Sequence, residues 1–100
     1  MDLVERIHAR VEGRVQGVGF RWFTADLALR LGLTGFVCNI LDGAVEAVAE
    51  GPSADLERWI EQIRRGPPMS RVLSCTVNMT TEPTGEYERF DIVHHKPEYK

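Results

Sequence analysis

The order in which strand-like and helix-like patterns follow each other constrains the fold of this 100-residue chain most strongly. Alternation of apolar and polar side chains, typical of half-buried strands, marks residues 3–12, 34–40, 44–50 and 71–79. Apolar residues recur at helical spacing from Phe23 to Leu31 and from Leu56 to Ile63, and Ser53 is the expected N-cap of the second helix. The chain therefore alternates as strand, helix, strand, strand, helix, strand.

This order favours one architecture. Two strand–helix–strand crossovers predict an antiparallel sheet with both helices on one face, the ferredoxin-like α+β sandwich of βαββαβ type. Phe90 and Ile92 indicate a short fifth strand. One hundred residues suffice for one domain with a single core, so we expect residues 1–100 to form one domain with a loose tail at about 94–100.

The segment between the first strand and the first helix is rich in glycine: Gly13-Arg14-Val15-Gln16-Gly17-Val18-Gly19-Phe20-Arg21. Glycine permits positive φ and close approach of the backbone to a ligand. A tight loop entering a helix directs several unpaired N–H groups at one spot, which attracts anions, and Arg21 adds a planar fork of donors suited to phosphate. We predict an oxyanion cradle with Arg21 as its clamp, although a simple turn with a surface arginine is the commoner explanation of such a segment taken alone.

Asn39 stands at the end of the second predicted strand. A right-handed crossover makes the strands at 3–12 and 34–40 run the same way, so the glycine-rich loop and Asn39 should lie at one edge of the sheet. Asparagine is disfavoured in an apolar strand. Asn39 is either an ordinary hairpin residue ahead of the Asp42-Gly43 turn or a residue that positions water or substrate beside the cradle.

Composition excludes several classes of function. The net charge of −3 and the pI near 5.6 argue against a nucleic-acid surface. No apolar run is long enough to cross a bilayer, and the charged N-terminus does not match a signal peptide, so we expect no membrane partner and a cytoplasmic location. Cys38 and Cys75 are too few for a zinc site, and neighbouring His94 and His95 would point to opposite sides of a strand, so we expect no metal site.

The sequence resembles the acylphosphatase family over most of its length. The resemblance is carried by Gly13 to Arg21, by Leu31-Gly32-Leu33-Thr34-Gly35-Phe36-Val37-Cys38-Asn39, and by Asp42-Gly43-Ala44-Val45-Glu46 with Gly51. It implies a ferredoxin-like enzyme with strand order 4-1-3-2 that hydrolyses the carboxyl–phosphate bond of small acyl phosphates, and we expect this enzyme to be a monomer. The products are a carboxylate and inorganic phosphate, and we expect inorganic phosphate to inhibit the enzyme as well. The resemblance implies neither a metal nor an organic cofactor.

The resemblance also implies residue roles. Arg21 and the loop amides would hold the phosphoryl group, the amides being those of Val15, Gln16, Gly17, Val18, Gly19 and Phe20. Asn39 would orient the attacking water. The implied strand order separates Cys38 from Cys75, so both should be free thiols. The chain departs from the family at Cys38, where a basic residue is frequent, and in residues 94–100, which run past the point where some members tie the catalytic arginine to a terminal carboxylate.

Three alternatives stay open. Gly17 to Phe23 loosely echoes a signature of RNA-recognition modules, which share this layout, but that signature belongs on the third strand and the chain is acidic. The chain is also compatible with a regulatory acylphosphatase-like domain of a larger protein, or with a non-catalytic phosphate-binding module. An enzyme is favoured because a carboxylate leaving group, whose conjugate acid has a pKa of roughly 4, needs no proton donor.

Overall fold

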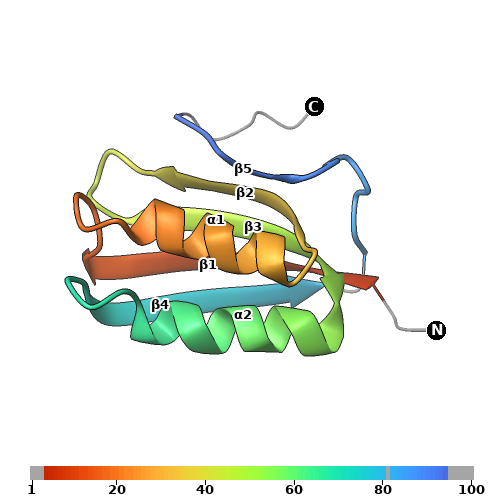
Figure 1. Cartoon of the computed structure of the whole chain (residues 1–100), viewed down its shortest axis with the longest axis horizontal. Coiled ribbons are helices and arrows are strands. Elements are labelled where there is room, and N and C mark those ends of the chain that lie inside the picture. Colours follow the sequence, from red (N-terminus) through yellow and green to blue (C-terminus); the bar gives the residue numbers. More distant parts are fainter. Residues whose placement is uncertain (1–3, 81, 95–100) are drawn as a thin grey trace.

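The computed structural model describes residues 4–80 and 82–94 (Figure 1). The strands in this part of the chain are β1 (Val4–Arg14), β2 (Thr34–Asn39), β3 (Val45–Pro52), β4 (Arg71–Thr80) and β5 (Phe90–Ile92). The helices are α1 (Phe20–Arg30) and α2 (Ser53–Arg65). The predicted order of elements is confirmed. The expected tail lies outside the described residues except for His94.

The sheet has the strand order β4-β1-β3-β2-β5, and both helices lie in front of it in Figure 1. The ferredoxin-like layout with order 4-1-3-2 is confirmed, and neighbouring strands among the first four are antiparallel. The fifth strand differs from the expected antiparallel sheet, because β5 pairs with β2 in parallel and places Phe90 opposite Gly35. The registers place the end of β4 and the beginning of β2 at the same end of the sheet. The segment that leaves β4 therefore reaches β5 at the end where β2 begins, so β5 runs in the same direction as β2.

The main core lies between the sheet and the two helices. Trp59 of α2 is fully buried there, and its Nε1 donates a hydrogen bond to the carbonyl oxygen of Thr24 in α1 at 3.2 Å. This bond ties the two helices together. Both cysteines are free, as expected, and Cys38 is buried in β2. No helix among the described residues is long and apolar enough to cross a membrane.

The opposite face of the sheet is partly covered by the segment 82–89. The carboxylate of Glu50, 4% exposed, accepts hydrogen bonds from the N–H groups of Thr84 and Gly85 at 2.8 and 2.9 Å. The ring of Tyr87 packs against Phe36, with ring centroids 6.0 Å apart. A buried carboxylate and an aromatic contact therefore hold this segment against the sheet.

The expected N-cap of α2 is wrong. Pro52 occupies the N-cap position and Ser53 is already helical. The Oγ of Ser53 instead donates a hydrogen bond to the carboxylate of Glu5 at 3.0 Å. The reason is that β3 stays paired with β1 as far as Pro52, opposite Val4, so the helix begins one residue after the strand has ended.

Candidate active site

The glycine-rich loop leaves β1 and turns directly into α1. Val15 and Phe20, 1% and 2% exposed, anchor its two ends in the core. Between them, Gly17 and Gly19 are exposed and adopt left-handed conformations with φ of 74° and 79°. A Cβ added at either glycine would meet no atom within 4 Å, so the backbone conformation and not crowding requires glycine here. The loop backbone is therefore open toward solvent.

The start of α1 is uncapped. Gly19 is the N-cap and offers no side-chain hydrogen bond, and the first turn of the helix contains no acidic residue. The first N–H groups of a helix lack intrahelical partners and carry a partial positive charge. The helix start, together with the loop before it, is thus suited to an anion.

The side chain of Gln16 fixes this loop against the β2–β3 hairpin. Its Nε2 donates two hydrogen bonds, to the carbonyl oxygens of Ile40 and Ala44 at 2.8 and 2.9 Å. Both acceptors belong to the turn that directly follows Asn39. Sequence reasoning used Gln16 only for its backbone amide and missed this contact. The available signal was a polar side chain inside an otherwise apolar and glycine-rich loop.

Asn39 is the last residue of β2 and lies on the helix-covered face of the sheet. It is paired with Val45 of β3, which belongs to the main core, as does Val37 two residues earlier on the same face. The Oδ1 of Asn39 is buried and has no hydrogen-bond partner among the residues that the structure describes. Leaving such an acceptor unsatisfied costs about 1–3 kcal/mol. The cost is explained if a ligand or water donates a hydrogen bond to this atom.

Arg21 lies in the first turn of α1 and lines a groove between α1 and β5. Because Ile92 of β5 pairs with Val37 of β2, the groove runs beside the strand that ends at Asn39. Within residues 4–80 and 82–94, Arg21 has no hydrogen-bond or ion-pair partner. Its guanidinium is available to a ligand.

The hairpin turn behind Asn39 is held by a second polar contact. Asp42 accepts hydrogen bonds from Arg10 of β1 and from the N–H group of Ala44. The hydrogen bond from Arg10, followed by that from Ala44, lowers the pKa of Asp42 below its ordinary value. Asp42 is thus a turn-forming carboxylate at neutral pH. The described residues contain no group of three or more His, Cys, Asp or Glu side chains placed to hold a metal ion.

The structure thus places every predicted site residue around the start of α1 and the end of β2. The loop amides precede Arg21 on one segment, and Gln16 links that segment to the turn after Asn39. What the arrangement offers chemically is a set of N–H donors, one guanidinium and one amide oxygen that lacks a donor.

Comparison with known proteins gives a consistent result. The family model for acylphosphatase matches residues 7–92. An acylphosphatase of Syntrophotalea carbinolica is 48% identical over 87 residues, which cover 87% of this chain and 94% of the relative. An acylphosphatase of Thermotoga maritima is 44% identical over 92 residues, covering 92% of this chain and 100% of the relative. The crystal structure of acylphosphatase from Bacillus subtilis superposes with a TM-score of 0.86 at 40% identity, covering 90% of this chain and 99% of that one.

Proposed function

This chain belongs to the acylphosphatase family and is an enzyme that hydrolyses acyl phosphates, and we propose that Arg21, Asn39 and the amides of residues 15–20 carry out the reaction. The observation that carries the proposal is the double hydrogen bond from Gln16. It fixes the amide loop against the turn after Asn39, so phosphoryl-binding and water-orienting groups are held in one rigid unit.

The loop amides and Arg21 bind the phosphoryl group. Its equatorial oxygens gain or redistribute negative charge in the transition state, and fixed N–H donors and a guanidinium stabilise that charge. Gly17 and Gly19 leave the loop backbone exposed, so its amides can approach the oxygens closely.

Asn39 orients the attacking water. Its unpartnered Oδ1 accepts a hydrogen bond from the water and directs a lone pair of the water oxygen at phosphorus. The new P–O bond forms as the bond to the acyl oxygen breaks, and the acyl group leaves as a carboxylate with the electron pair. The proton of the water passes to a phosphoryl oxygen. Because the conjugate acid of the leaving group has a pKa of roughly 4, no side-chain acid is required.

This mechanism is tested by following the hydrolysis of benzoyl phosphate by ultraviolet absorbance. We expect activity at neutral pH that a chelator leaves unchanged, competitive inhibition by inorganic phosphate, and little hydrolysis of a phosphate monoester, whose alkoxide leaving group needs a proton donor. Asn39→Ala should lower kcat by about 10²-fold, as for loss of an electrostatic or orienting group in an active site. The inhibition constant for phosphate should stay within about twofold, because the phosphate ligands are retained.

Asn78→Ala is the matched control, since Asn78 is exposed on β4 and pairs with His8, well before the end of β1 from which the loop leaves. Undiminished kcat in Asn39→Ala, or a loss of phosphate affinity equal to the loss of kcat, would remove Asn39 from the assigned role.

The proposal includes a monomeric, cytoplasmic enzyme that forms one domain over residues 1–100 and binds neither nucleic acid nor membranes. The acidic net charge supports the absence of a nucleic-acid partner. Size-exclusion chromatography with light scattering tests the monomer, and a filter-binding assay with single-stranded RNA tests the RNA-recognition alternative.

A further inference from the structure

The groove between α1 and β5 is apolar over most of its length and contains Arg21. It encloses about 460 Å³, which falls within the roughly 300–1,000 Å³ typical of small-molecule sites. Its described lining is Arg21, Trp22, Ala25, Leu29, Phe90, Asp91, Ile92 and His94. The carboxylate of Asp91 already pairs with the Nε of Arg89 at 3.2 Å.

The α1 side of the groove is a second apolar stripe on a helix that already has a core-facing one. Trp22, Ala25 and Leu29 recur at i, i+3 and i+7, and so share one side of the helix. Trp22 is 75% exposed and Leu29 is 59% exposed, whereas Ala25 between them is only 5% exposed and belongs, with Phe20, Thr24 and Ala28, to the buried residues of α1. An indole and an isobutyl group left in solvent beside a cation indicate a binding surface.

We propose that this groove binds the acyl group of the substrate and favours acyl phosphates with an aromatic or extended aliphatic acyl group. The inference rests on the proposed function, because it takes Arg21 as the phosphoryl ligand. The occupant that fits is negatively charged at one end and apolar at the other. An acyl phosphate with a bulky acyl group has this shape, and its charged end would meet Arg21 while its apolar end lies against Trp22 and Leu29.

The assignment sets a geometric requirement for the water that Asn39 orients. In-line displacement at phosphorus requires the attacking water and the leaving carboxylate on opposite sides. Arg21 lines the groove, whereas Asn39 is not among its described lining residues. An acyl group in the groove must therefore lie on the side of the phosphoryl group away from the water that Asn39 orients.

The test compares two substrates in one variant. In Trp22→Ala, kcat/KM for benzoyl phosphate should fall about tenfold, as for loss of apolar contacts in a specificity pocket, while kcat/KM for acetyl phosphate changes less than about twofold. Leu29→Ala should show the same pattern with a smaller loss. Leu73→Ala is the matched control, because Leu73 is 70% exposed on β4 at the other edge of the sheet, and it should change neither value. Equal losses on both substrates, or no loss, would overturn the proposal.

A binding measurement separates the groove from turnover. Benzylphosphonate should bind about tenfold more tightly than methylphosphonate to the unmodified protein, and Trp22→Ala should abolish this difference. Trp22 is exposed whereas Trp59 is buried, so a change in fluorescence lost in Trp22→Phe reports the groove. If Arg21→Ala left turnover of both substrates undiminished, the proposed function would fail. If Arg21→Ala abolished both while Trp22→Ala kept the ratio of substrates unchanged, the groove proposal alone would fail.

Discussion

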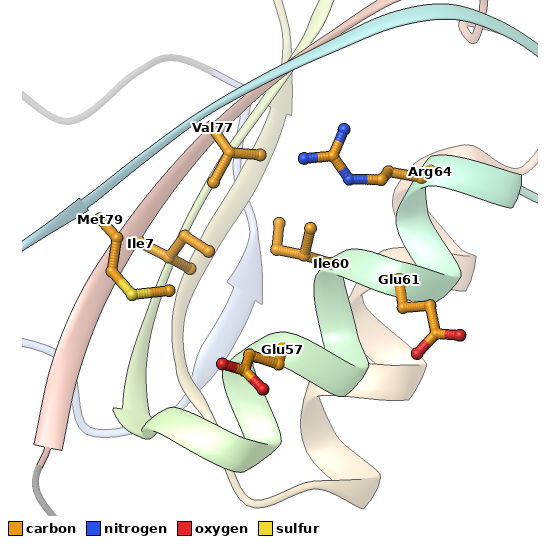
Figure 2. Close-up of a pocket in the computed structure, with 7 residues that line it drawn as sticks. All are labelled: Ile7, Glu57, Ile60, Glu61, Arg64, Val77 and Met79. Atoms are coloured by element: carbon orange, nitrogen blue, oxygen red, sulfur yellow. The ribbon is translucent and has the colours of Figure 1, made fainter.

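In the part of the chain that the structure describes, a groove lies beside each helix on the helix-covered side of the sheet, and the groove beside α1 adjoins the loop that we propose to bind the phosphoryl group. The second groove, of about 300 Å³, lies between α2 and strands β1 and β4. Figure 2 shows its apolar side chains, Ile7, Ile60, Val77 and Met79, gathered between helix and strands, with Glu57, Glu61 and Arg64 along α2. Each groove thus combines apolar walls with one arginine.

The difference lies in the position of that arginine along its helix. Arg64 is in the last turn of α2 and donates a hydrogen bond to the carbonyl oxygen of Cys75 at 3.3 Å. Arg21 is in the first turn of α1, which has no acidic residue, whereas the first turn of α2 contains Asp55. Because the N-terminal end of a helix is positive, α1 adds to the charge of its arginine and α2 does not. We therefore expect an anion to bind in the first groove, where the N-terminus of α1 and the N–H groups of the loop before it lie on the same segment as the arginine.

The largest expected effect tests this comparison directly. Arg21→Ala should lower kcat/KM for benzoyl phosphate by about 10²–10³-fold, because the transition state loses a charged donor. Arg64→Ala in the second groove should leave kcat/KM within about twofold. The measurement is the initial rate by ultraviolet absorbance for both purified variants, with folding checked by circular dichroism. Comparable losses in the two variants would show that the two grooves do not differ in the way described.

A smaller effect is expected at Gln16, which connects the glycine-rich loop before α1 to the β2–β3 hairpin. Gln16→Ala should lower kcat about tenfold, because a shift of the phosphoryl-binding loop relative to Asn39 disturbs the alignment of water and phosphorus. Loss of its two neutral hydrogen bonds should also lower the free energy of unfolding by about 1–2 kcal/mol.

Gln62→Ala, at an exposed position on α2, is the control for the amide side chain. Urea denaturation and steady-state kinetics measure the two effects at Gln16. A role in stability alone predicts a normal kcat in the folded Gln16→Ala protein, and that result would contradict the positioning role.

The proposed anion-binding end of the first groove follows from local features of the sequence, whereas the groove itself does not. Gly17, Gly19 and Arg21 lie within one short segment, so local chemistry and the crossover rule suffice to predict a cradle near Asn39. The contacts of Gln16 escape such reasoning because their acceptors are backbone carbonyls 24 and 28 residues away. The other side of the groove, opposite Trp22 and Leu29, is formed by β5. The parallel pairing of β5 with β2 depends on the path of the chain after β4, which local sequence patterns do not specify.

The smallest expected effect on activity concerns Glu50, which lies on the face of the sheet opposite both grooves. Burial raises the pKa of its carboxyl, but hydrogen bonds from the N–H groups of Thr84 and Gly85, the hydroxyl of Thr84 and the side chain of Arg6 outweigh burial and lower the pKa below its ordinary value. A carboxyl whose pKa is lower in the folded than in the unfolded state stabilises the protein above the unfolded pKa of roughly 4.3. This stabilisation is lost as the pH falls through the folded pKa.

Glu50→Gln should therefore lower the free energy of unfolding by about 1–3 kcal/mol at pH 7, as for hydrogen bonds to a charged group, and by progressively less as the pH falls below about 4. Urea denaturation across this pH range measures the difference, with Glu88→Gln, exposed in the same segment, as the control. Because Glu50 is not among the described residues that line either groove, kcat/KM for benzoyl phosphate at pH 7 should stay within about twofold of the unmodified protein. A stability difference that stays constant down to pH 3 would show that ionisation of Glu50 does not hold the 82–89 segment against the sheet. A selective loss of activity on benzoyl phosphate in the folded variant would show that the two faces of the sheet are coupled, and that the first groove depends on more than α1 and β5.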